Sequence, residues 1–219
     1  MGILRGKIGN IVAREFNGKQ VISAKPGPYK KSKSLKLQAE RSKFSSVVNF
    51  AKFINSVSVL KSIWNQSNVE GFSAYHKILK TNLLLTINGQ LGVSNIIVPV
   101  SPNSLQINYT LLLNCIECEI LHLQNILSEY ASHRYMLQFV FMFAEPHCSK
   151  NVANNIVGSS QSLDLQGLVN RVAITLNVSE EIKRLLTQYG KCFLYSTLIW
   201  IDDTETKLNW SSTSVKNIC

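Results

Sequence analysis

The chain has 219 residues, of which 45% are hydrophobic and 16% charged. This composition excludes a disordered chain, and the charged fraction lies below the roughly 25% typical of soluble domains. The net charge is +10, and residues 1–50 carry 11 basic and two acidic side chains, so a basic N-terminal quarter precedes a nearly neutral body. A basic block suits an anionic partner such as nucleic acid, an acidic protein or anionic lipid, and a solvated basic arm is the alternative.

Neither a signal peptide nor a membrane span is expected. No apolar run of about 7–15 residues follows the first basic residues, as a secretory signal requires. The stretch from Thr81 to Ile116 has no charge, but Pro99 and Pro102 help to interrupt it, so it cannot form a spanning helix of about 20 residues. Five cysteines, an odd number, favour free thiols in a reducing compartment. We therefore expect a cytoplasmic or virion protein.

The N-terminal segment predicts a β-hairpin. Residues 11–16 and 19–23 form two runs rich in branched side chains, and Asn17-Gly18 separates them. Asn-Gly supplies the two positive φ angles that a type I′ turn needs. An isolated two-stranded hairpin is only marginally stable, so this one must pack on the body or on another molecule.

Helices are predicted next. Apolar residues at spacings of three and four, beginning at Phe44, indicate a helix over residues 34–64, which the run 55–58 could divide in two. Ser67 and Glu70 fit a capping box for a second helix to about residue 82, with Phe72 and Leu79 on its inner face.

Short runs rich in branched and aromatic residues follow and predict strands. They are Ile96–Val100, Leu105–Leu113, Tyr135–Phe143, Val172–Leu176 and Cys192–Ile201, with a turn at Asp202–Thr206 before a last strand over 207–215. The sequence thus predicts an α+β fold, in which an N-terminal β-hairpin and two helices precede a C-terminal Ig-like antiparallel β-sandwich. The expected divisions are a basic hairpin arm (1–33), a helical segment (34–82) and a β-sandwich domain (83–219).

The order of several motifs resembles a known family. These motifs are Gly6-Lys7-Ile8-Gly9, a basic Ser/Lys stretch, Gln38-x-x-Arg41-x-x-Phe44, Phe72-x-x-Tyr75-His76 and the late Gly190…Leu194-Tyr195 and Ser211-Ser212. The chain resembles an uncharacterised Bacteroidota family, a domain of unknown function with an N-terminal Gly-Lys-Ile/Val-Gly hairpin segment. The resemblance covers most of the chain and departs at Asp202-Asp203-Thr204, where that family usually has an Asp-Gly turn. It implies the order of the fold and the host range, and no activity.

No motif predicts a metal, a cofactor or catalysis. Zinc sites favour Cys and His in fours; the candidates are Cys115-x-x-Cys118 with His122 and with His147-Cys148, and a strand would point Cys115 and Cys118 in opposite directions. The acidic pairs Asp202-Asp203 and Glu180-Glu181 fit a turn and a helix start better than a glycosidase centre. We expect a protein that is not an enzyme.

The sequence favours a structural or assembly subunit of a phage, a phage-like particle or a filament, which docks through its basic N-terminal arm and forms a homo-oligomer or larger assembly. The alternative is a nucleic-acid-binding protein that uses the same segment. The residues predicted to bind the partner are Arg5, Lys7, Arg14, Lys19, Lys30, Lys31, Lys33 and Lys36.

Overall fold

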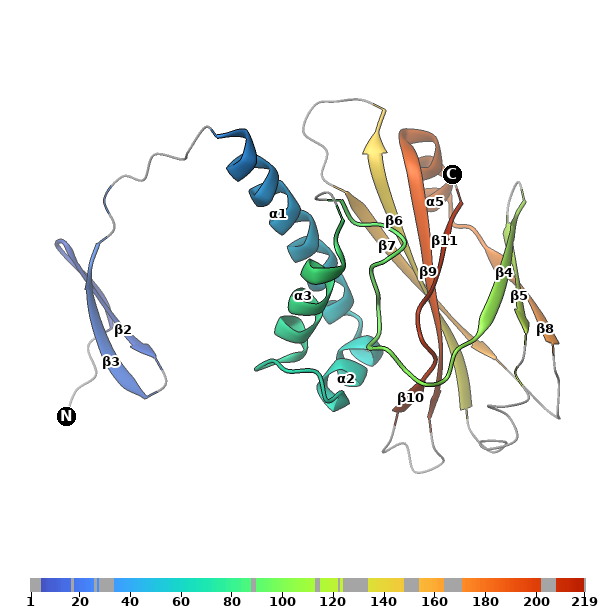
Figure 1. Cartoon of the computed structure of the whole chain (residues 1–219), viewed down its shortest axis with the longest axis horizontal. Helices are drawn as coiled ribbons and strands as arrows, with labels where there is room; N and C mark the ends of the chain where they lie inside the picture. The colour runs from blue at the N-terminus through green and yellow to red at the C-terminus, as the bar shows by residue number, and fades with distance from the viewer. Residues whose placement is uncertain are drawn as a thin grey trace. The chain divides into compact units, whose positions relative to one another are not determined.

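The computed structural model describes residues 5–16, 18–25, 27, 34–87, 90–112, 115–121, 123, 134–147, 154–163, 171–201 and 208–218. The chain divides into two compact units, Met1–Gln38 and Ala39–Cys219. Within the described residues the fold is mixed α+β with antiparallel sheets, as predicted (Figure 1).

The first unit contains a three-stranded antiparallel sheet in the order β1-β2-β3, with β1 Gly6–Ile8, β2 Ile11–Phe16 and β3 Lys19–Ala24. Phe16 pairs with Lys19, so a two-residue turn joins β2 to β3, and Gly18 in that turn has a φ of 72°. The predicted hairpin is therefore confirmed, although Asn17 lies outside the described residues. Strand β1, which the sequence did not predict, adds to β2 through a turn in which Gly9 has a φ of 57°.

The helical region begins with α1 (Leu35–Ser56) and α2 (Ser58–Gln66), which confirms the predicted division near residues 55–58. The predicted capping box is wrong. Ser67 ends α2, where its hydroxyl donates to the carbonyl of Trp64. The next helix, α3, spans Ala74–Leu85, and the side chain of Ser73 caps it by accepting a hydrogen bond from the backbone N–H of His76.

The second unit is built on a five-stranded sheet in the order β10-β9-β6-β7, with β11 also paired to β9. Its strands are β6 (Arg134–Pro146), β7 (Asn155–Leu163), β9 (Tyr189–Ile201), β10 (Leu208–Trp210) and β11 (Ser214–Asn217). Strands β6 and β9 are predicted by their long apolar runs. Strand β7 was missed because most of its residues are polar.

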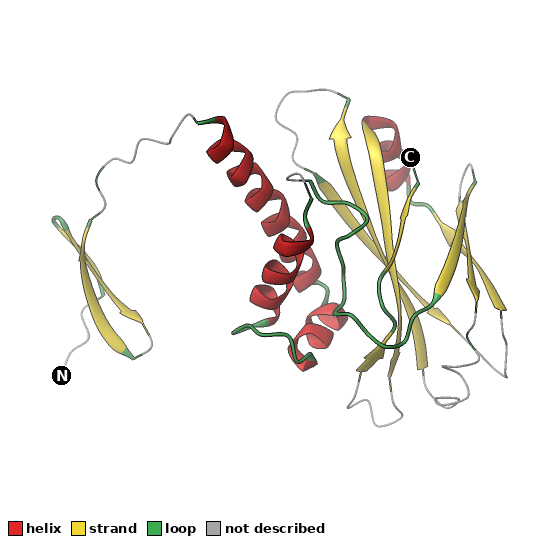
Figure 2. Ribbon diagram, viewed as in Figure 1, coloured by secondary structure: helices red, strands yellow, loops and turns green. Residues whose placement is uncertain are grey.

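The central strands of the five-stranded sheet, β6 and β9, are buried on both faces (Figure 2). Phe139 and Phe141 of β6 pack in a core shared with a three-stranded sheet and with α5 (Glu180–Gln188). That second sheet has the order β4-β5-β8, with β4 Gln106–Leu111, β5 Cys115–Leu121 and β8 Arg171–Asn177. Val140 and Met142 of β6 face the other way, into a core formed with the helices. This alternation explains why β6 reads as one continuous apolar run.

Helix α1 packs closely on the outer part of this sheet. Gly158 of β7 has no side chain where Phe53 of α1 approaches, and a Cβ at Gly158 would lie 2.9 Å from the Phe53 ring. A glycine within a strand often marks such a close approach. The glycine therefore serves helix packing and does not interrupt β7.

The predicted strand at Ile96–Val100 is wrong, because these residues form a loop in which Ile97 and Val98 are fully buried. Backbone N–H and C=O groups of this loop form hydrogen bonds with side chains and not with a neighbouring strand. Asn82 Oδ1 accepts from the N–H of Ile96 at 2.9 Å, and Thr213 Oγ1 accepts from the N–H of Ile97 at 3.1 Å. The indole of Trp64 donates to the carbonyl of Ile97. The uncharged composition of this segment reflects its burial and not strand structure.

Candidate partner-binding surfaces

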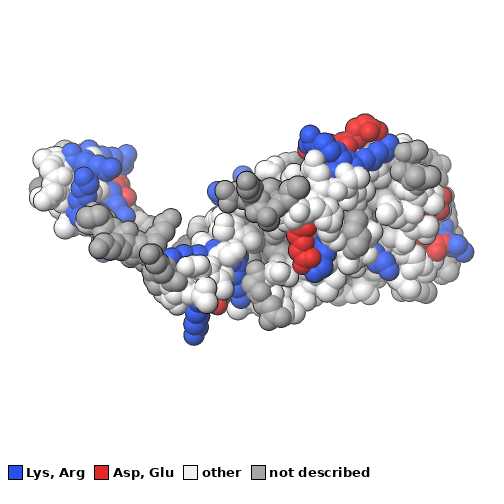
Figure 3. Space-filling model, turned by 90° about the horizontal axis from the view of Figure 1, so that it is seen from above, with Lys and Arg blue, Asp and Glu red and all other residues white. Residues whose placement is uncertain are grey.

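The strand register gives the N-terminal sheet two unlike faces. Lys7 is paired with Val12, and Arg14 with Val21, while Lys19 is paired with Phe16. Cross-strand partners lie on the same face, and side chains alternate along a strand. Three of the predicted basic residues therefore share one face of this sheet. Figure 3 shows Lys and Arg side chains gathered on the N-terminal unit.

The opposite face of the N-terminal sheet is mostly apolar, and Glu15 with its cross-strand partner Gln20 is the polar pair on it. The register pairs Ile8 with Ile11, Ala13 with Ile22, and Ile11 with Ala24. The side chains of the three isoleucines are largely exposed: Ile8 at 66%, Ile11 at 50% and Ile22 at 61%. Exposure of three neighbouring large aliphatic side chains marks an interaction surface.

The other predicted partner-binding residues are placed less uniformly. Arg5 forms an ion pair with Glu15, so it is partly neutralised by its own unit. Lys36 is exposed in the first turn of α1. Lys30, Lys31 and Lys33 lie outside the described residues. The structure thus brings three of the eight predicted residues together on one face.

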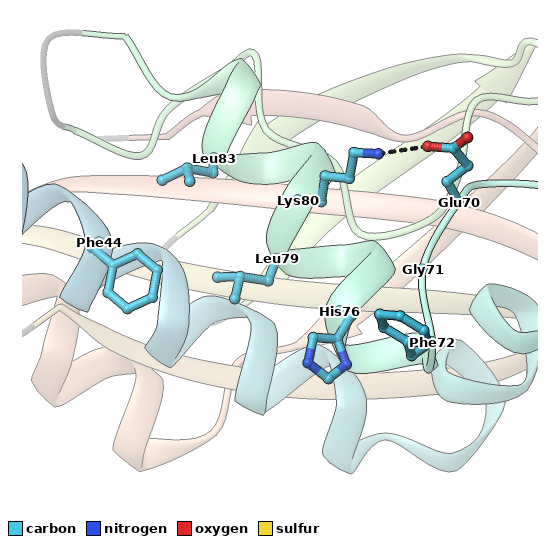
Figure 4. A pocket seen from close by; sticks show the side chains of 8 residues that line it. All are labelled: Phe44, Glu70, Gly71, Phe72, His76, Leu79, Lys80 and Leu83. Atoms are coloured by element: carbon cyan, nitrogen blue, oxygen red, sulfur yellow. Dashed lines mark hydrogen bonds and ion pairs between the residues drawn. The ribbon is translucent and has the colours of Figure 1, made fainter. Parts of the chain in front are cut away.

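A second surface, which the sequence did not predict, is an apolar hollow of about 680 Å³ in the second unit (Figure 4). Phe44 of α1, Leu79 and Leu83 of α3, and Phe72 in the preceding segment line it. Phe72 was expected on the inner face of a helix. It instead lies before α3 and is fully exposed, at 101%. Gly71, which precedes Phe72, lies so close to α3 that a Cβ at this position would be 2.8 Å from the side chain of Lys77.

One ion pair lies at the rim of this hollow. Lys80 Nζ donates to Glu70 Oε2 at 2.8 Å, and this hydrogen bond, with the lysine charge, lowers the pKa of the Glu70 carboxyl. His76, also in the lining, accepts or donates a hydrogen bond at Nδ1 with the Ser73 hydroxyl. Both polar groups are thus engaged locally, and the remaining lining is hydrocarbon.

The predicted cysteine pair lies on β5. Cys118 is buried in the core between the two sheets, and Cys115 is half-buried. Burial raises the pKa of the Cys118 thiol to about 12, so it remains protonated at neutral pH and is a poor metal ligand. His122 and Cys148 lie outside the described residues, and within the described ones no three metal-ligating side chains gather.

The acidic pair Glu180-Glu181 occupies the first turn of α5, after the cap Ser179, as predicted for a helix start. Asp202 and Asp203 lie outside the described residues. None of the helices in the described segments is long and apolar enough to cross a membrane. No model of a known protein family matches the chain, and no curated protein is similar to it.

Proposed function

We propose that the chain is a non-enzymatic structural subunit, a component of a phage, a phage-like particle or a filament, and that its N-terminal sheet docks on protein through its apolar face. The observation that carries this proposal is the exposure of Ile8, Ile11 and Ile22 on one face of that sheet. A sheet that is apolar on one face must bury that face against another element. A neighbouring subunit supplies that cover in an assembly.

The second candidate is nucleic-acid binding by the opposite face. Lys7, Arg14 and Lys19 share that face with Phe16, which is 66% exposed and offers a ring for base stacking. Phosphate contacts by the three cations would give affinity that falls steeply with salt. Protein docking is favoured because the apolar face has no role in a purely electrostatic complex.

Two finer points belong to the same proposal. We infer an Ig-like body, supported by two antiparallel sheets that share one core. We also infer membership of the Bacteroidota family named above, supported by Gly9 at positive φ in the β1–β2 turn of the Gly-Lys-Ile-Gly segment. A cytoplasmic or virion location follows from this assembly role.

Variants on the two faces separate the candidates. Ile11→Lys with Ile22→Lys should weaken self-association at least about tenfold, because each buried Ile contributes about 1.5–3 kcal/mol. Lys7→Gln with Arg14→Gln and Lys19→Gln should leave it unchanged. Sedimentation velocity measures the mass of each full-length variant. An unchanged mass for the isoleucine variant would refute protein docking through this face.

Binding to duplex DNA provides the converse test. If the basic face is the functional one, the three-Gln variant should reduce the slope of log K against log salt by about 3, because three phosphate contacts are lost. Fluorescence anisotropy with a labelled duplex at several salt concentrations measures that slope. A salt-dependent complex that these substitutions weaken, together with an unaffected isoleucine variant, would replace the first proposal by the second.

A further inference from the structure

Most sheet edges among the described strands are protected. Beside β9, the register shifts by one residue between the pairs Trp210–Ile199 and Ser214–Ser196, which is a β-bulge. The loop before β4 covers that edge, with the hydroxyl of Ser101 donating to the carbonyl of Trp210. Charged side chains mark two other edge strands: Lys19 is in β3, and Arg171 is in β8. Proteins commonly use bulges, coverage and charges to prevent unwanted pairing.

Within the described residues, strand β7 shows neither a charge nor a bulge nor a second partner strand. Its nine residues, Asn155–Leu163, include no charged residue and no proline. They pair with β6 from Leu163–Tyr135 to Asn155–Phe143 without a shift in register, so the strand has no bulge. Among the described strands, none pairs with its other side. Its outer edge therefore presents a straight row of backbone N–H and C=O groups.

We propose that β7 pairs antiparallel with β7 of a second copy, across a two-fold axis near Ser159, and joins two five-stranded sheets into one. Pairing of an edge with itself is a closed, isologous contact. Strand addition at an edge gains its affinity from main-chain hydrogen bonds. This inference concerns the second unit and does not rest on the proposed docking of the N-terminal sheet.

The composition of β7 favours a second copy as its occupant. Ser159 is the central residue, so the two-fold arrangement places Gly158 opposite Ser160 and Val157 opposite Gln161. No like charges meet in any register, because the strand has none. The second unit is nearly neutral: residues 39–219 carry 14 basic and 12 acidic side chains, a net charge of +2. Two such units can approach without strong repulsion.

Strand β4 provides a matched control. It is also an uncharged edge strand, but it has six residues and lies against β11. Asn108 and Thr110 of β4 are exposed, as are Ser160 and Ser162 of β7. Two lysines can therefore be introduced on either edge at exposed positions.

The first experiment uses the full-length chain with Ile11→Lys and Ile22→Lys as background, so that association through the N-terminal sheet is blocked. Sedimentation velocity should give a dimer for this background. Adding Ser160→Lys and Ser162→Lys should give the single-chain mass of 24.5 kDa, whereas adding Asn108→Lys and Thr110→Lys should preserve the dimer. A background that is already monomeric, an unaffected mass with the β7 lysines, or equal loss with the β4 lysines would each overturn the inference. Failure of the N-terminal proposal appears separately, as an unchanged mass between the wild type and the background.

A second measurement keeps the inference testable if the lysine variants unfold. Paired residues across antiparallel strands have Cβ atoms about 4.5–5.5 Å apart, close to disulfide distance. Ser159→Cys treated with copper phenanthroline, which accepts the two thiol electrons, should form a linked dimer on a non-reducing gel. Asn108→Cys and the wild type, which carries the same native cysteines, are the controls. Equal linking in all three proteins would contradict the two-fold pairing at Ser159.

Discussion

The N-terminal sheet and the five-stranded sheet bury apolar side chains to very different extents. In β6, Phe139 and Val140 point in opposite directions and both are fully buried. In β2, Ile11 is half exposed, although neighbours on its own face are apolar. A strand between two layers tolerates apolar residues at every position, whereas a sheet without a second layer in its own unit depends on a partner for one face. The comparison teaches that similar aliphatic residues are buried in the core of one unit and exposed in the other, where we propose that they form an interface.

The strongest test of this difference is Phe141→Ala. Phe141 is fully buried between the two sheets of the second unit. Its truncation should lower the free energy of unfolding by about 3–5 kcal/mol, as for other buried aromatic residues. Urea denaturation followed by circular dichroism measures the loss. Phe72→Ala is the control, because Phe72 is fully exposed and its loss should cost less than about 0.5 kcal/mol. Equal costs would show that burial does not distinguish the two positions.

A smaller effect is expected for Asn82→Ala. The side chain of Asn82 donates to the carbonyl of Ile96 at 3.0 Å and accepts from its N–H at 2.9 Å. Removing it leaves both backbone groups of Ile96 without this partner, which should lower the free energy of unfolding by about 1–3 kcal/mol. The same denaturation experiment measures it. Asn108→Ala, at an exposed position of β4, should change stability little, and a comparable loss there would contradict the role assigned to Asn82.

The sequence correctly predicted the elements whose own residues are typical of the structure that they form. Asn17-Gly18 identified the hairpin, and the apolar runs of β6 and β9 identified the central strands. Strand β7 was missed because its residues are mostly polar. Its strand conformation depends on pairing with β6, which the sequence of β7 does not reveal. Ile96–Val100 was wrongly predicted as a strand, since burial in a loop selects the same branched side chains. Ser67 was predicted to cap the next helix, but it ends α2, and Ser73 caps α3.

The basic residues of the candidate site were predicted from the sequence, but their arrangement in space was not. Basic residues were recognised by charge, but their common face depends on the register of β1 and β3 against β2. The alternation of Ile11 and Ala13 with Val12 and Arg14 carried a weak signal of two unlike faces. The apolar hollow brings α1 and α3 together, and no local pattern reports such a contact.

Gly18→Val tests the N-terminal sheet itself. A β-branched residue at the observed φ of 72° is strained by about 1–2 kcal/mol. No heavy atom lies within 4 Å of a Cβ at Gly18, so the cost is in the backbone alone. Amide hydrogen exchange in β2 and β3 should accelerate, and assembly should weaken. Gly27→Val is the control, because Gly27 is exposed and has no positive φ. Unchanged exchange and assembly in Gly18→Val would show that the turn is wrongly assigned.

The smallest expected effect concerns the basic block after the hairpin. Replacing Lys30, Lys31, Lys33 and Lys36 with Gln removes four charges and leaves the three strands intact. If the N-terminal sheet docks through its isoleucines, the mass of the assembly in sedimentation should not change. Deletion of residues 1–28 should abolish that contact, because it removes all three strands. Loss of assembly in the four-Gln variant, with nucleic acid bound to the unmodified protein, would reverse the assignment. The apolar face would then lose its proposed role, and the difference between the two sheets would need another explanation.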